Sequence, residues 1–187
     1  MRQRPQIEAR LATVMFLVMV FAAAAQAQVL NSGASTISLN AVLNDSITVS
    51  LSSNAVNFTL TQASGSNPGS TSVTATTTWL LRPNVGSLKL YAFFASSASA
   101  LTDGTGNNIP SSDFQISNNG GAFNALTNTV PFGGANAGLQ LSSTTILGNN
   151  RKGTRTDVMN FNINLVPLPN LPAGTYTGTL TIQAQAI

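Results

Sequence analysis

The sequence predicts an all-β protein, an antiparallel Ig-like β-sandwich of about eight to ten strands. Apolar and polar residues alternate with a period of two in short segments from residue 37 to the end of the chain, as in strands with one buried face. Turn-forming residues separate these segments roughly every 8–15 residues. No helical period follows residue 27, which argues against any α/β fold.

The first 27 residues are typical of a secretory signal peptide. A basic start is followed by an apolar stretch at 11–25, and Ala25-Gln26-Ala27 fits a small-x-small cleavage site. The apolar stretch is about 15 residues long, which is short of the roughly 20 needed to span a bilayer. We therefore expect cleavage before Gln28, no membrane insertion afterwards, and export to the periplasm, cell surface or extracellular space.

The charge of the chain lies largely in this predicted signal. The full sequence has eight Lys and Arg against five Asp and Glu, a formal net charge of +3. Three of the basic residues and Glu8 precede residue 28, which leaves five basic and four acidic side chains, or 5 − 4 = +1. So few charges give no basic surface of the kind that binds nucleic acid or an anionic membrane.

The segment after the signal has apolar residues at odd positions on both sides of a turn signal, Asn44-Asp45. This pattern predicts either two short strands or one long strand with a kink. The residues that share the phase are Ile37, Leu39, Ala41, Leu43, Ile47, Val49 and Leu51. After residues 52–54 the phase switches to Val56, Phe58 and Leu60, which predicts a turn and a returning strand.

The next two strands are predicted at 73–81 and 88–94. The first ends at Arg82-Pro83, because Pro lacks the backbone donor that a sheet needs. Its Trp79 is interpreted as a core residue rather than as a surface residue that stacks on sugars. The second strand is apolar on both faces, since Tyr91 and Phe93 alternate with its other apolar residues, so we expect it to be central.

Further strands follow with a weaker pattern. Strands are predicted around 114–116, 123–126 and 139–141, with an Asn-Asn-Gly-Gly turn at 118–121 between the first two. Apolar residues then alternate with Asn at 159–165. The last predicted strand lies within 173–187, whose even positions carry Tyr176, Gly178, Leu180, Ile182, Ala184 and Ala186.

The residue types exclude most catalytic chemistry. The chain has no His and no Cys, so Ser-His and Cys-His pairs and the usual zinc sites cannot form. Four Asp residues, at 45, 103, 113 and 157, are scattered, and carboxylate catalysis would need two of them to converge. We therefore predict no catalytic residue, no cofactor and no metal site.

Two polar segments are nevertheless candidates for binding. Asp103-Gly-Thr-Gly-Asn107 carries oxygen ligands at alternate positions, which suits Ca²⁺, although an ordinary Asp-Gly turn is the preferred interpretation. Arg151-Lys152-Gly-Thr-Arg155 is the densest charge cluster. We expect it to be a solvated loop tip, with a contact to an anionic glycan or a lipid headgroup as the alternative.

The two terminal strands lack the charges and prolines that normally protect sheet edges. Such strands either pair within their own domain or pair with another chain by β-augmentation. The partner in the second case is another copy or an assembly chaperone.

The order of these features resembles secreted bacterial pilin-like domains of the spore coat protein U and archaic chaperone-usher type. The resemblance lies in the signal, in Ile37-x-Leu39-x-Ala41-x-Leu43, in the all-β body and in the terminal Leu-Pro-Ala-Gly-Thr-Tyr-Thr-Gly-Thr-Leu-Thr-Ile. It implies periplasmic export and donor-strand exchange, in which the arm of one subunit completes the sheet of the next. The donor side chains would be Ile37, Leu39, Ala41 and Leu43, and the groove or chaperone contacts would be Leu180, Ile182, Ala184 and Ala186. Many such subunits carry a Cys pair, which this chain lacks.

The expected function is that of an exported, non-enzymatic structural or adhesive subunit of a bacterial surface structure such as a fimbrium. It would comprise a signal at 1–27, an arm or first strand at 28–44 and a sandwich domain at 45–187. The alternative is a self-complete monomeric sandwich that binds a glycan or other surface ligand through exposed Trp79, Tyr91 or Phe93.

Overall fold

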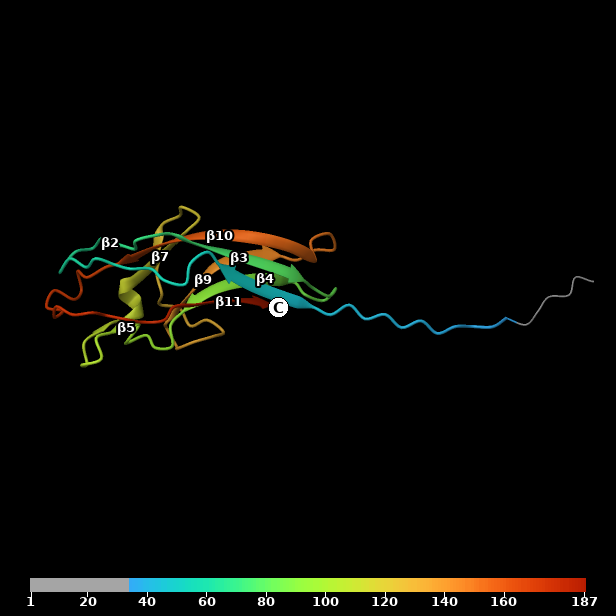
Figure 1. Cartoon of the computed structure of the whole chain (residues 1–187), viewed down its shortest axis with the longest axis horizontal. Helices are drawn as coiled ribbons and strands as arrows, with labels where there is room; N and C mark the ends of the chain where they lie inside the picture. The colour runs from blue at the N-terminus through green and yellow to red at the C-terminus, as the bar shows by residue number, and fades with distance from the viewer. Residues whose placement is uncertain (1–33) are drawn as a thin grey trace, which may run out of the picture. The chain divides into compact units, whose positions relative to one another are not determined.

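The computed structural model describes residues 34–187, and the signal predicted at 1–27 lies outside them. Residues 34–45 form no regular secondary structure. Residues 43–187 form one compact unit, to which all the elements below belong (Figure 1).

The compact unit contains eleven strands and one 3₁₀ turn, η1 (Ser111–Asp113), among the described residues. The strands are β1 (Ser46–Leu51), β2 (Asn67–Pro68), β3 (Val73–Leu80), β4 (Ser87–Phe93), β5 (Leu101–Thr102), β6 (Asn108–Ile109), β7 (Phe114–Asn118), β8 (Phe123–Ala125), β9 (Gly138–Thr145), β10 (Lys152–Ile163) and β11 (Thr181–Ala186). No helix among residues 34–187 has the length and hydropathy to cross a membrane.

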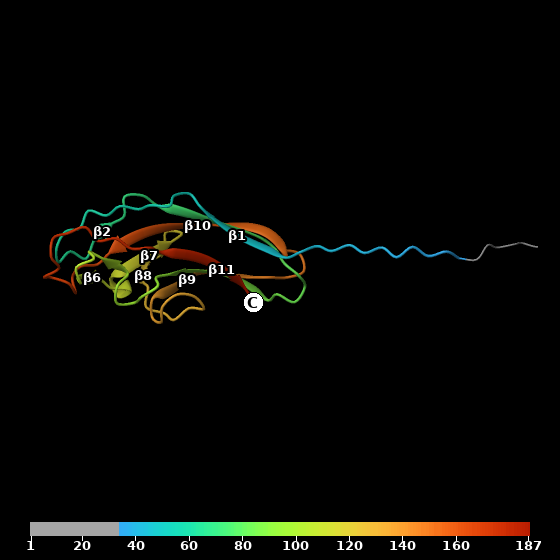
Figure 2. The same cartoon turned by 60° about the horizontal axis from the view of Figure 1, so that its bottom comes forward.

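Two antiparallel sheets face each other across the core. The larger has the order β1-β3-β10-β7-β8, with β2 also paired to β10, and the smaller has the order β11-β4-β9. A further short pair, β5–β6, lies outside both. The views in Figures 1 and 2 show the two layers. The prediction of an all-β antiparallel sandwich is confirmed, and the arrangement is consistent with an Ig-like domain.

The core has a large cluster between the sheets and a smaller one around Trp79. Trp79 is 5% exposed and its Nε1 donates a hydrogen bond to the carbonyl of Asn150 at 2.9 Å, which confirms its predicted place in the core. Strand β4 is central in its sheet and buried on both faces, as predicted. On its outer face Tyr91 and Phe93 pack against Phe132.

The weakly patterned middle of the chain also forms strands where they were predicted. β7 and β8 pair as a hairpin, and their turn places Asn119 and Gly120 at positive φ, 51° and 76°. Asn and Gly tolerate this left-handed conformation, which explains why the turn falls there. β9 is longer than the predicted 139–141 and runs through Thr145.

The predicted loop tip at 151–155 is wrong, because the strand β10 already begins at Lys152 and pairs with β3 from there. One charge of this segment, Arg155, forms an ion pair with Asp157 further along the same strand. Asp157 has no exposed side-chain surface and accepts hydrogen bonds from Arg155 Nε at 3.0 Å and from Asn119 Nδ2 at 2.8 Å. Ser142 Oγ in β9 reaches the same carboxylate at 3.1 Å, so Asp157 joins the two sheets.

The predicted reversal after residue 52 is also wrong. The chain continues in the direction of β1 as far as residue 62 and turns back only at 63–66. Evidence for this course is the hydrogen bond from Ser70 N to the Asn57 carbonyl at 2.8 Å and the bridge between Phe58 and Gly69, which extend the β1–β3 pairing. The change of phase at residues 52–54 is therefore an irregularity within one continuous edge.

Candidate functional site: an open groove between the sheets

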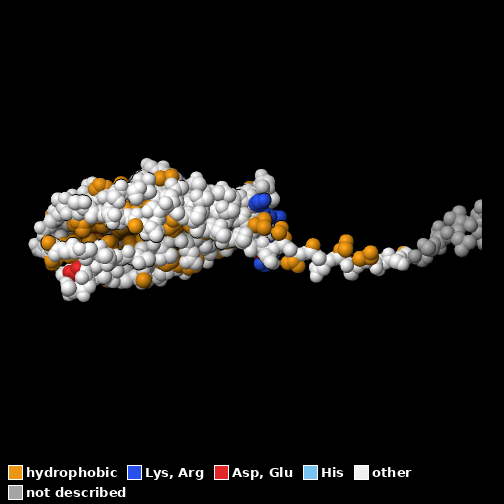
Figure 3. All heavy atoms as spheres, in the orientation of Figure 1, with side chains coloured by type: hydrophobic (Ala, Val, Ile, Leu, Met, Phe, Trp, Pro, Cys, Tyr) orange, Lys and Arg blue, Asp and Glu red, His pale blue; other side chains and the backbone are white. Residues whose placement is uncertain are grey.

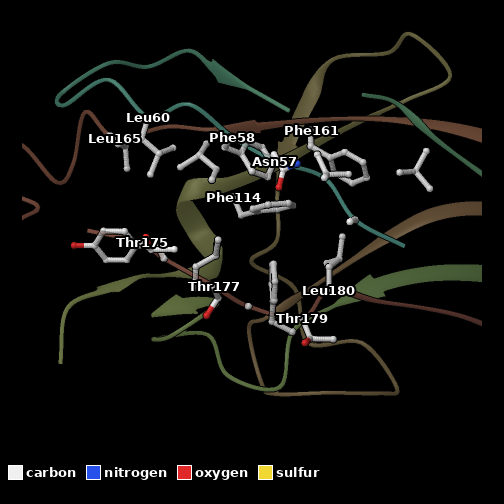
Figure 4. A pocket seen from close by; sticks show the side chains of 18 of the residues that line it. Asn57, Phe58, Leu60, Phe114, Phe161, Leu165, Thr175, Thr177, Thr179 and Leu180 are labelled. Carbon is white, nitrogen blue, oxygen red and sulfur yellow. The ribbon is translucent and has the colours of Figure 1, made fainter. Parts of the chain in front are cut away.

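An open groove of about 810 Å³ separates two edges of the sandwich. One edge is the segment 53–62 that follows β1, named here the N rim. The other is the segment 172–182 that leads into β11, named here the C rim. Apolar side chains line the furrow between them in Figure 3, and Figure 4 shows the two rims from close by.

The N rim alternates like a strand but is paired on one side. Val56, Phe58 and Leu60 are half-buried and pack against the main core, while the residues between them are exposed. The backbone of this rim bonds to residues 64–70 on its outer side. Gly69 is needed there, because a Cβ at this position would lie 2.7 Å from Val56 Cγ1.

The C rim is held away from the N rim by its own contacts. The backbone groups of Thr177 and Thr102 exchange two hydrogen bonds of 2.9 Å, and the hydroxyl of Tyr176 donates to the Pro172 carbonyl at 2.8 Å. At Gly178 a Cβ would overlap the carbonyl oxygen of Ala100. The regular strand begins only at Thr181, so the predicted closing strand is shorter than its alternating pattern suggested.

The floor of the groove is a cluster of aromatic rings. Phe114 contacts Phe58, Phe94 and Phe161 with ring centroids 5.9, 5.1 and 6.0 Å apart. None of the residues that line the groove is charged. Covering such a surface with apolar side chains lowers the free energy, because it removes the surface from water.

The two rims lack a common strand partner within residues 34–187. No backbone hydrogen bond joins N rim to C rim, and β1 and β11 are end strands of their sheets. At the inner end of the groove, near Leu51 and Ile182, β1 and β11 approach each other and share the Trp79 cluster through Ile47 and Ala184. At the outer end, the Nε2 of Gln62 makes one long hydrogen bond of 3.5 Å to the Leu171 carbonyl.

The structure places the predicted contact residues in four different surroundings. Leu180 and Ile182 line the groove, whereas Ala186 packs against the smaller core cluster around Trp79. Ala184 packs against both core clusters. The arm residues Ile37, Leu39, Ala41 and Leu43 are all exposed, with 86%, 91% and 79% of the surface of Ile37, Leu39 and Leu43 accessible.

The Asp103 segment forms an ordinary turn. Its carboxylate accepts hydrogen bonds from Thr105 N at 2.8 Å, Thr105 Oγ1 at 2.8 Å and Asn107 Nδ2 at 2.7 Å. The bonds from Asn107 and Thr105 lower the pKa of Asp103 to about 2. Because both oxygens face their own loop, the carboxylate is not directed at an external cation.

The other acidic residues do not converge with it. Asp45 pairs with Arg82, Asp157 pairs with Arg155, and burial raises the pKa of Asp113. Among the described residues, no group of three or more acidic, His or Cys side chains could hold a metal ion.

The aromatic platform that glycan binding would require is absent at the three predicted positions. Trp79, Tyr91 and Phe93 are all buried, with the indole in the core and the other two rings beneath Phe132. A sugar ring cannot stack on these faces without displacing the residues that cover them.

Sequence reasoning missed the N rim as part of the site. The alternation of Val56, Phe58 and Leu60 predicts a turn and a returning strand, and nothing in it points to a groove. The absence of charge from residues 46–62 was the available signal. No family model, curated protein or solved structure matches the chain. Fold and site together define an antiparallel β-sandwich with an open apolar groove between its layers.

Proposed function

We propose that this chain is an exported structural subunit that polymerises by strand donation, with the arm of one copy filling the groove of another. The observation that carries the proposal is the uncharged groove between two edges that share no strand partner. The ligand that fits such a site is an extended β-strand. It supplies backbone donors and acceptors to the rims and apolar side chains to the floor.

The arm has the composition that this groove requires. Ile37, Leu39 and Leu43 share one phase and are almost fully exposed, and residues 34–43 carry no charge. Exposed apolar side chains in this number are costly in water unless a partner covers them. Residues 37–43, when extended, span about 20 Å, which is the same length as residues 176–182 of the C rim.

The energies allow a stable junction. Burial of three large aliphatic side chains contributes about 1.5–3 kcal/mol each, and the backbone hydrogen bonds add about 0.5–1.5 kcal/mol each. Association costs about 4–15 kcal/mol. Side-chain burial alone is therefore close to this cost, and the hydrogen bonds to the rims decide whether the junction is tight.

Two adjacent arm residues provide a matched test. Val42 and Leu43 are equally exposed, at 78% and 79%, but only Leu43 shares the phase of Ile37 and Leu39. We expect Leu43→Asp, and likewise Leu39→Asp, to abolish polymers seen by size-exclusion chromatography with light scattering. Val42→Asp should leave them in place, since its side chain points away from the groove.

A synthetic peptide of residues 34–44 provides a second readout that does not depend on polymer formation. Added to the Leu43→Asp protein, it should raise the melting temperature, because it binds the folded state. An unaltered chain that remains monomeric, together with a peptide that has no effect, would contradict the proposal.

A further inference from the structure

We infer that the inserted arm adopts one register, in which Ala41 of one copy lies opposite Gly178 of the next. This inference rests on the proposed function and specifies how the same groove recognises its occupant. It follows from the direction of the rims, from the number of inward positions and from the shape of the groove at Gly178.

The direction of the arm follows from the two ends of the groove. The rims run in opposite directions, with Leu60 and Thr175 at the outer end and Leu180 toward the inner end (Figure 4). The inner end is closed by the approach of β1 and β11. In the donor copy, residue 43 is followed closely by Asp45, which is paired to Arg82 of its own body. The arm must therefore leave through the outer end, with Leu43 nearest to it, and it runs antiparallel to the C rim.

The register follows from matching the inward positions. Residues directly opposite each other in an antiparallel pair point to the same face of the sheet. The C rim has four positions of the inward phase, 176, 178, 180 and 182, and the arm has four apolar positions of one phase. Superposing the two sets antiparallel pairs Leu43 with Tyr176, Ala41 with Gly178, Leu39 with Leu180 and Ile37 with Ile182.

The shape of the groove agrees with this register at the pair of Ala41 and Gly178. The space that a side chain at 178 would occupy is filled by the backbone of Ala100 and Leu101. Ala100 is buried in the core and Leu101 lines the groove, so the floor beside Gly178 is formed by main chain and cannot recede. A small donor residue is required there, and Ala41 is the one small member of the series from Ile37 to Leu43. A shift of two residues in either direction would place Leu39 or Leu43 at this point.

Pairs of introduced cysteines can test the register directly by disulfide formation, because the chain has no Cys of its own. The full chain, exported to an oxidising periplasm, would carry Leu39→Cys with Leu180→Cys. Opposed residues in an antiparallel pair have Cα atoms about 4.5–5.5 Å apart, which lies within the roughly 4.4–6.8 Å that a disulfide spans. We expect a ladder of disulfide-linked oligomers on a non-reducing gel, and the pair Ile37→Cys with Ile182→Cys should give the same ladder.

The offset pair Leu39→Cys with Ile182→Cys is the control, and it should give at least tenfold less ladder. A ladder from the offset pair that equals the matched pair would overturn the register while leaving strand donation intact. A disulfide within single chains would show that the arm fills the groove of its own chain. The inference that a second copy supplies the arm would then be wrong. If neither pair links and the unaltered chain is monomeric, the proposed function itself fails.

A composition-matched exchange tests the size argument separately. The double variant Leu39→Ala with Ala41→Leu keeps the same residues and the same phase but places Leu opposite Gly178. A peptide of residues 34–44 with this exchange should stabilise the Leu43→Asp protein far less than the native peptide. Equal stabilisation by the two peptides would overturn the register, whereas no stabilisation by either would count against the proposed function.

Discussion

The indole ring of Trp79 lies over Gly153, its paired residue in the neighbouring strand β10. A Cβ at position 153 would lie 2.5 Å from Cζ2 of the indole, so the ring fits only because this position has no side chain. We expect Gly153→Ala to lower the free energy of unfolding by about 1–3 kcal/mol, the usual cost of overpacking a core. A denaturant titration monitored by the fluorescence of Trp79, the sole Trp, measures this change in the free energy of unfolding.

Gly148→Ala is the control for this prediction. A Cβ at position 148 would meet no atom within 4 Å, so the same substitution should change stability by no more than about 0.5 kcal/mol. A loss at Gly148 that equals the loss at Gly153 would mean that the contact with the indole does not set the cost.

Thr77 has a buried hydroxyl without a hydrogen-bond partner among the described residues. Its side chain is inward in β3, next in phase to Trp79. Because Val has the same shape without the polar atom, Thr77→Val should raise the free energy of unfolding by about 1 kcal/mol. The neighbouring Thr78 is exposed and bonds Thr154 at 3.3 Å, so Thr78→Val should give no comparable gain in the same titration.

Stability should fall in acid because of Asp157. Burial raises the pKa of this carboxyl, but hydrogen bonds from Arg155, Asn119 and Asn118 outweigh it and hold the pKa below the usual 3.8. A pKa that is lower in the folded state gives stability that is present above pH 3.8 and is lost as the pH falls through the folded value. Asp103, with a pKa of about 2, acts in the same direction.

The carboxyl of Asp113 should have the opposite effect. Burial raises its pKa, so its contribution is most favourable at low pH and is lost as the pH rises through the folded value. At pH 6, Asp113→Asn should therefore raise the melting temperature, while Asp157→Asn should lower it and flatten its dependence on pH between 6 and 2. Calorimetry at several pH values tests both, and shifts of the same sign would contradict the assignment.

The sequence predicted the sandwich well because alternation reports burial of one face, and most such faces here are buried against the opposite sheet. It predicted the groove poorly for the same reason. Phe58 alternates with its neighbours as a residue in a complete sheet would, so the alternation does not reveal that no backbone hydrogen bond joins its rim to the C rim. The role of Asp157 was likewise hidden, because its partner Ser142 belongs to the opposite sheet.

Gly178 connects the shape of the C rim to the proposed assembly. An Ala side chain there would overlap the carbonyl of Ala100, which is main chain in the core and cannot move aside. Gly178→Ala should therefore displace the rim, lower the melting temperature and weaken binding of the arm peptide at least tenfold. Gly174→Ala lies on the same rim, where a Cβ would have ordinary contacts of 3.8 Å to Tyr176 and 3.9 Å to Asp103. It should leave both properties unchanged in calorimetry and peptide titration. If Gly178→Ala also left both properties unchanged, the rim would tolerate a side chain at this point, and the close approach at Ala100 would have no part in selecting the arm.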